Sequence, residues 1–248
     1  MAERSQRLAR LIADQLAKRQ KPDGTFDQHS FYAPAFAAAL WAQLDPALYA
    51  PQIEAALSAL EAEQQTPRYH REFIEHGLRQ IPGLCAERLN AILRNAPTQS
   101  PDVANWQVLG MINRHLSLKK GAGKNRKLIN WLHWAFIRLR YWRTPLFWDR
   151  PTCFSSQYHA FCAALLTDSP EAAHRIIADK ATTLMAKLSG DHGYANLLGR
   201  GAGQSFGEVC ALYALTKHGF HTQADAILFR LETAALMTGT IPLNLISP

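Results

Sequence analysis

The feature that most constrains the fold of this 248-residue chain is a helical spacing of apolar residues that runs through almost its whole length. The alternation of apolar and polar residues that is typical of strands is nearly absent. Glycine and proline clusters interrupt the helical pattern at short intervals, so the links between helices are short. The expected helices are residues 4–19, 31–43, 48–64, 69–79, 85–95, 103–118, 126–141, 156–166, 170–188, 204–217 and 221–236. The sequence therefore predicts an all-α protein built from antiparallel helical hairpins.

The length fits one globular domain or two small ones, and we expect a single domain spanning residues 1–248. Hydrophobic residues make up 48% of the chain and charged residues 19%, a balance that is typical of folded soluble domains. The glycine- and lysine-rich run 119–127 is expected to be an exposed loop inside this domain. The N-terminus leads into an amphipathic helix rather than an apolar signal core, which favours a cytoplasmic location. The four cysteines lack the spacing of a metal or disulfide site, so we expect buried free thiols, no metal and no cofactor.

A polar loop followed by an alanine-rich helix recurs along the chain. The clearest copy is residues 191–207, which hold five glycines and run directly into the apolar helical pattern 209–215. Weaker copies are Asp23-Gly24-Thr25-Phe26 before residues 37–42, and Ser155-Ser156-Gln157-Tyr158-His159 before residues 160–166. Glycines suit a main chain that turns sharply or closely approaches a ligand. Alanine-rich helices pack closely on several sides, which predicts an inner ring of such helices inside an outer ring of longer, charged ones.

These loops, and the segment Gly199-Arg200-Gly201 with Gln204 and Phe206-Gly207, resemble the α/α-toroid proteins that act on polysaccharides. The resemblance implies an α/α toroid or partial toroid and a carbohydrate-active enzyme that cleaves an acidic polysaccharide or oligosaccharide, with β-elimination slightly preferred over hydrolysis. Terpenoid cyclases and protein-prenylation subunits share the rhythm of loops and helices. The motif-like part of the resemblance covers only residues 155–166 and 191–215.

The resemblance also implies the candidate site residues. Toroid polysaccharide lyases neutralise a uronate carboxylate with Asn or Arg and move protons with Tyr or His, because the charge that develops during β-elimination must be stabilised. The first choice for proton transfer is His159, with Tyr158 and His192 as rivals. The polar residues expected to bind and orient the substrate are Arg200, Asn105, Trp106, Asn196 and Gln204.

Other interpretations of the same residues stay open. A histidine at the start of an apolar helix, such as His159, commonly packs in a core and bonds to backbone groups, and Arg200 would serve equally as a structural tie. Hydrolysis would need two nearby carboxylates. Asp191 is the best candidate for one of them, with Asp23, Asp102 or Asp149 as its partner.

Residues 126–148 combine tryptophans with a basic flank, and the chain carries a net charge of +7. Aromatic and cationic side chains together suit peripheral contact with a membrane, sugar stacking, or a buried helix whose arginines reach solvent. Nucleic acid is disfavoured as a partner because no recognition motif accompanies the charge. The alternative to the enzyme is therefore a non-catalytic glycan- or membrane-binding protein of surface-polysaccharide biosynthesis.

Overall fold

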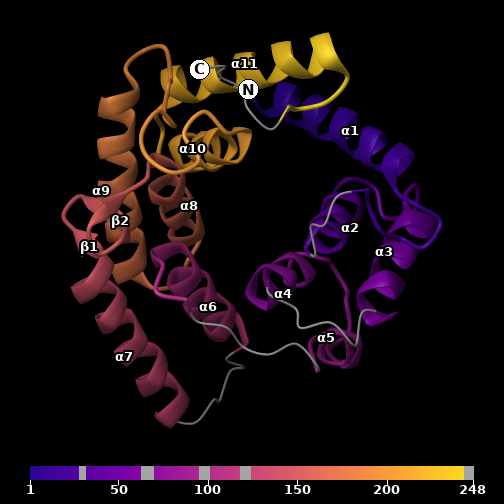
Figure 1. Cartoon of the computed structure of the whole chain (residues 1–248), viewed down its shortest axis with the longest axis horizontal. Coiled ribbons are helices and arrows are strands. Elements are labelled where there is room, and N and C mark those ends of the chain that lie inside the picture. The colour runs from indigo at the N-terminus through magenta and orange to yellow at the C-terminus, as the bar shows by residue number, and fades with distance from the viewer. Residues whose placement is uncertain (28–31, 63–69, 95–100, 118–123, 243–248) are drawn as a thin grey trace. The chain divides into compact units, whose positions relative to one another are not determined.

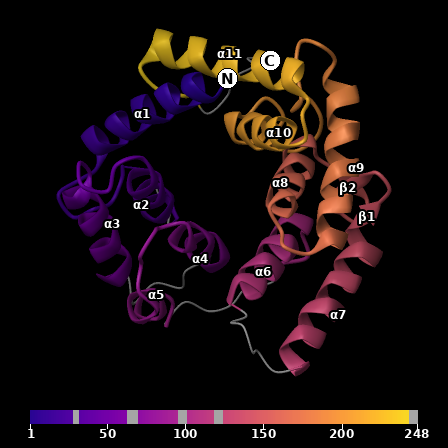
Figure 2. The same ribbon diagram turned by 180° about the vertical axis from the view of Figure 1, so that it is seen from behind.

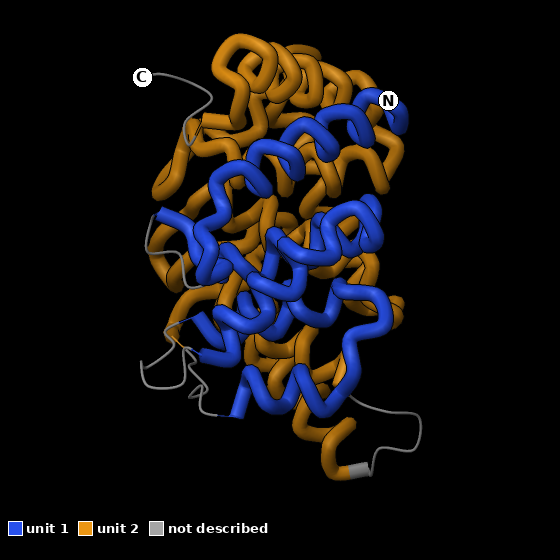
Figure 3. Tube along the Cα trace, turned by 90° about the vertical axis from the view of Figure 1, so that its right-hand side faces the viewer, with its two compact units in different colours: residues 1–99 blue, residues 100–248 orange. Residues whose placement is uncertain are grey.

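The computed structural model describes residues 1–27, 32–62, 70–94, 101–117 and 124–242. The chain divides into two compact units, residues 1–99 and residues 100–248 (Figure 3). The division falls in the proline-containing break before residue 101, and residues 118–123 of the expected loop lie outside the described residues. The single toroid expected over residues 1–248 depends on how the two units are arranged, and it stays a prediction.

The described residues are mostly helical, which confirms the all-α class (Figure 1). Unit 1 contains α1 (Ala2–Arg19), α2 (Ala33–Leu44), α3 (Ala50–Ala62), α4 (Arg71–Arg79) and α5 (Ala86–Leu93). The helices of unit 2 are α6 (Ala104–Ser117), α7 (Lys124–Tyr141), α8 (Ser156–Thr167), α9 (Ala172–Ser189), α10 (Ser205–Lys217) and α11 (His221–Thr238).

The structure adds a small antiparallel sheet that the sequence pattern does not reveal. Its strands β1 (Trp142–Arg143), β2 (Leu146–Arg150) and β3 (Cys153–Phe154) lie in this order between α7 and α8. Trp142 pairs with Phe147 across the first two strands, and Trp148 pairs with Phe154 across the second and third. Burial alternates along β2, but its sequence, Leu-Phe-Trp-Asp-Arg, does not alternate apolar and polar residues. Strand β2 nevertheless places Asp149 in the interior of unit 2.

Unit 1 is built around α2, whose alanines are buried on several sides. This helix packs against α1, α3 and α4, and small side chains permit such close contact on more than one face. At its centre the buried indole of Trp41 donates a hydrogen bond from Nε1 to the backbone oxygen of Ala13, at 3.0 Å. The turn at Asp23 is structural, because the Asp23 carboxylate accepts hydrogen bonds from the backbone N–H and the hydroxyl of Thr25.

Unit 2 has α8 and α10 at its centre, side by side in both views (Figures 1 and 2). Helix α8 also contacts α6, α9 and β2, and α10 also contacts α9 and α11. Both central helices are alanine-rich and buried on more than one side, as the sequence predicts for inner helices. Ser155 caps the N-terminus of α8, and its hydroxyl accepts a hydrogen bond from the Tyr158 N–H at 3.4 Å.

The burial of the four cysteines tests the expectation that they are buried free thiols. Cys162 and Cys210 are buried free thiols as expected, whereas Cys85 and Cys153 are exposed, which corrects that part of the prediction. Burial raises the pKa of the Cys210 thiol to about 12. Of the helices in the described segments, none is both long enough and apolar enough to cross a bilayer.

Candidate functional site

The glycine-rich segment 190–204 joins α9 to α10 and packs onto the start of α8. Gly199 and Gly201 have φ angles of +78° and +79°. Residues other than glycine rarely adopt this region of backbone conformation. A Cβ atom at Gly199 would overlap the backbone oxygen of Phe154, and one at Gly201 would overlap the Gln157 side chain. The close approach that the sequence predicts is therefore made to the protein's own backbone and to α8.

Asn196 holds this segment together from a fully buried position. Its side-chain Nδ2 donates hydrogen bonds to the backbone oxygens of Gly201 and Gln204, at 2.8 and 3.0 Å. Its Oδ1 accepts one from the Ser156 hydroxyl at 3.0 Å. With all of these groups engaged inside the protein, the geometry gives Asn196 a structural role. The predicted role in substrate binding gains no support from it.

A second buried network anchors the same segment to α11. The carboxylate of Glu208 is fully buried; it accepts hydrogen bonds from the Asn196 backbone N–H at 3.2 Å and from Arg230 at 3.0 Å. Arg230 also donates to the backbone oxygens of His192 and Gly193 and stacks over the ring of Tyr194, 4.4 Å from its centroid. Burial raises the pKa of Glu208, and the neighbouring Arg230 opposes that rise.

Arg200 occupies a similar but more open arrangement. It makes a two-pronged ion pair with Asp149 of β2, at 2.9 Å for the shortest contact. Its guanidinium also lies over the Tyr158 ring, 4.2 Å from the centroid. The Arg200 side chain is 51% exposed and that of Asp149 only 3%. The buried carboxylate and the ring thus hold a cation at the surface of unit 2, at the junction of the sheet, the α8 start and the glycine-rich segment.

His159 lies beside this cluster but is turned into the core. Its Nδ1 accepts a hydrogen bond from the Phe147 N–H at 3.1 Å, and its Nε2 is 3.1 Å from the backbone oxygen of Ala181, to which it donates. Burial lowers the pKa of His159 to about 4. A neutral, buried imidazole with both nitrogens bonded to backbone fits the structural interpretation of this residue. The geometry does not support the first choice for proton transfer.

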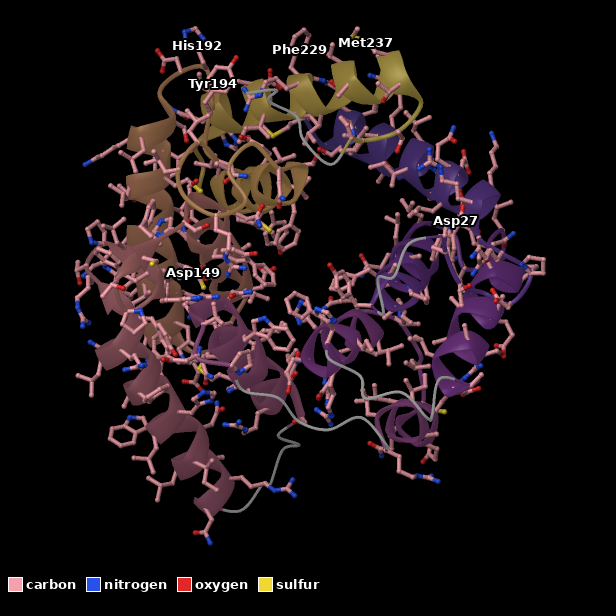
Figure 4. The ribbon with its side chains drawn as sticks, viewed as in Figure 1. Asp27, Asp149, His192, Tyr194, Phe229 and Met237 are labelled. Carbon is pink, nitrogen blue, oxygen red and sulfur yellow. The ribbon has the colours of Figure 1, made fainter. Side chains whose placement is uncertain are left out.

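The remaining predicted residues are scattered over unit 2. Asp191 and His192 are exposed beside Tyr194, and Figure 4 places His192 at the outer edge of the unit, away from Asp149. Asn105 is buried on the first turn of α6, next to the partly buried Trp106. Gln204 is the N-cap residue of α10, where its backbone oxygen accepts from Asn196. The structure therefore joins Tyr158 to Arg200 but does not bring His192 to them.

Sequence reasoning missed two residues of this cluster as partners of Arg200 and Tyr158. Asp149 was weighed only as a carboxylate for hydrolysis, and its pairing with Arg200 spans 51 positions. Gln157 is buried beside Gly201, and its Oε1 has no hydrogen-bond partner among the described residues. The polar run Ser155-Ser156-Gln157 before an apolar helix is the one signal that pointed to Gln157.

No metal site coincides with the cluster in the described part of the chain. Within the described segments, no three His, Cys, Asp or Glu side chains converge as a metal ion would require. A depression of about 310 Å³ lies elsewhere, between the Thr144-Pro145 turn and α9, and Lys180 and Lys187 are among its lining residues. The Arg200 cluster is thus a surface feature. Comparison of the chain with family models, curated proteins and solved structures gave no match in any of the three.

Proposed function

We propose that unit 2 binds an acidic saccharide at Arg200 and Tyr158 and cleaves it by β-elimination. The observation that carries the proposal is the half-exposed side chain of Arg200, fixed between the buried carboxylate of Asp149 and the ring of Tyr158. Asp149 does not engage Nη1 of the guanidinium, and this group can donate a charge-assisted hydrogen bond to a ligand carboxylate. An aromatic ring at its side offers a face on which a sugar ring can lie.

Comparison with Arg230 supports a binding role for Arg200. Both arginines pair with a buried carboxylate and stack on a tyrosine. Arg230 also donates to two backbone oxygens, and its side chain is only 18% exposed. Arg200 donates to Asp149 through Nε and Nη2 only, and in the described part of the chain its Nη1 has no hydrogen-bond partner. That nitrogen is the group left to bind a ligand.

Tyr158 is the residue proposed to transfer protons. Its hydroxyl has no hydrogen-bond partner among the residues that the structure describes, and its ring is held by Arg200. In the proposed reaction the Tyr158 oxygen, in its phenolate form, removes the proton next to the uronate carboxylate while Arg200 binds that carboxylate. The electron pair forms a carbon–carbon double bond, the bond to the leaving oxygen breaks, and that oxygen takes up the proton now carried by Tyr158.

The positions of the acidic residues favour elimination over hydrolysis. Hydrolysis needs two carboxylates facing one bond, yet Asp149 is buried and paired with Arg200. Asp102 is bonded to Arg140 and Tyr141. Asp191 is exposed beside His192, which lies away from Asp149 (Figure 4). None of the three is placed as a free carboxylate beside Arg200.

The replacement Tyr158→Phe tests the proposal, since it keeps the ring under Arg200 and removes only the hydroxyl. We expect formation of the unsaturated product, followed by ultraviolet absorbance on a panel of uronate-containing polysaccharides, to fall about 100-fold or more. Saccharide affinity should change less than about threefold, because Arg200 stays in place. Tyr194→Phe is the matched control, since it removes the same hydroxyl from the tyrosine under Arg230 and should leave turnover unchanged.

A second variant separates binding from catalysis. Arg200→Lys keeps a positive charge for Asp149 but removes Nη1, so it should weaken saccharide binding by about tenfold. New reducing ends without an unsaturated product would replace elimination by hydrolysis. Saccharide binding that Arg200→Lys weakens, with no product from the unaltered chain, would favour the non-catalytic alternative. Equal effects of Tyr158→Phe and Tyr194→Phe would contradict the proposed role of Tyr158.

A further inference from the structure

Helix α7 exposes a row of large apolar side chains on the side opposite its packing face. Asn130, Trp134, Ile137 and Tyr141 are buried and form the packing face, which contacts α6, β1 and β2. The exposed apolar residues of the helix are Leu128, Ile129, Trp131, Leu132, Phe136 and Leu139. At about 100° per residue, all six fall within an arc of about 160°. Leu139 is 78% exposed and Trp131 is 63% exposed, so this face is unpartnered within unit 2.

Positive charge borders the apolar row on both sides. Helix α7 contains five Lys and Arg residues and no Asp or Glu. By helical spacing, Lys127 and Arg138 lie beyond Trp131 at one edge, and Arg126 and Arg140 lie beyond Ile129 at the other. Arg140 is paired with Asp102. Within the described segments, the exposed Arg126, Lys127 and Arg138 have no acidic partner.

The arrangement distinguishes between occupants of this face. A second copy of the chain would bring two like-charged borders together, which opposes self-association. A surface of anionic lipid satisfies both features, because the acyl region receives the leucines while lipid phosphates meet the basic border. Trp131, at the boundary between the apolar row and Arg138, has the position that indole rings prefer at a headgroup layer. Figures 1 and 2 show no other element of unit 2 over the outer side of α7.

We propose that α7 docks unit 2 on an anionic membrane surface, with the helix lying in the plane of the interface. Leu128, Leu132 and Leu139 insert between lipids. Arg126, Lys127 and Arg138 contact phosphates. This inference is independent of the saccharide site, because none of these residues belongs to the Arg200 cluster. Binding should require both the apolar row and anionic lipid, and it should weaken as salt concentration rises.

Co-sedimentation of the full chain with vesicles tests the proposal. The unaltered protein should bind vesicles of phosphatidylcholine containing phosphatidylglycerol and bind phosphatidylcholine vesicles at least about tenfold more weakly. The double variant Leu132→Glu with Leu139→Glu should lose at least about tenfold in affinity for the anionic vesicles. Both positions are exposed, so the unfolding temperature should change little, and this is measured on the same samples.

The matched control uses exposed apolar residues outside α7. Leu236 and Met237 near the end of α11 are 80% and 81% exposed, and glutamate at both should leave vesicle binding unchanged. Arg126→Glu with Lys127→Glu should abolish the preference for anionic lipid. Absence of vesicle binding would overturn the proposal. So would an equal loss of vesicle affinity in the α7 double variant, Leu132→Glu with Leu139→Glu, and in the α11 double variant, Leu236→Glu with Met237→Glu. The proposal would also be overturned if the protein binds no vesicles but forms a dimer, and if Leu132→Glu with Leu139→Glu disrupts that dimer.

Discussion

Protonation of His159 should destabilise the protein at acidic pH. The size of this loss in the free energy of unfolding follows from the buried position of the imidazole. In the folded state Nδ1 accepts from the Phe147 N–H, so a proton on Nδ1 would break that bond and leave a charge in the core. The pKa is lowered from 6.5 to about 4 by burial. Because the unfolded chain binds this proton below about pH 6.5 and the folded chain does not, stability falls between pH 6.5 and about 4. A pKa difference of about 2.5 corresponds to roughly 3 kcal/mol.

The measurement compares urea unfolding of the unaltered chain and of His159→Gln between pH 7 and pH 4. Glutamine can accept from Phe147 and donate to Ala181 but does not titrate. Between pH 7 and pH 5 the unaltered chain should therefore lose roughly 2 kcal/mol more than the variant. Burial also lowers the pKa values of His133 and His174 to about 4, and their contributions cancel in the comparison. An imidazole of His159 that titrates above about pH 6 in the folded protein, followed by NMR, would refute the reasoning.

Two further predictions concern stability. Asn196→Ala removes two donated bonds and one accepted bond from a fully buried position, and should lower the free energy of unfolding by about 3 kcal/mol; a loss below about 1 kcal/mol in urea titration would contradict its role. Trp41→Phe removes the bond to Ala13 and leaves a cavity in unit 1, so it should cost about 2–4 kcal/mol, measured by the same method. A loss close to zero would mean that α1 does not depend on this contact.

The sequence pattern located the helices well because their burial repeats locally. The expected segments 156–166 and 221–236 correspond to α8 (Ser156–Thr167) and α11 (His221–Thr238), and the other nine helices agree with similar accuracy. The sheet between α7 and α8 escaped prediction because β1 and β3 have only two residues each, and because the sequence of β2 does not alternate apolar and polar residues although its burial does. Their formation depends on packing against α6, α8 and α9.

The candidate site was less predictable because its pairings are not local. The loop at 191–207 is conspicuous in the sequence, yet the spacing does not reveal that Gly199 and Gly201 pack against Phe154 and Gln157. His159 and Tyr158 are neighbours in the sequence, and only packing decides that one faces the core and the other faces Arg200. The partner of Arg200 lies 51 positions away, a distance at which spacing carries no signal.

The contacts of the segment between α9 and α10 determine how unit 2 unfolds locally. The Ser156 N–H donates to the Leu198 oxygen at 2.9 Å, and the Leu198 N–H donates to the Ser156 hydroxyl at 3.0 Å. The first turn of α8 is thus completed by residues that follow α9 in the chain. Its backbone amides at this point exchange with solvent only when the segment detaches, and detachment exposes Glu208 and Asn196. A stretch without regular secondary structure therefore belongs to the same cooperative folding unit as the central helices.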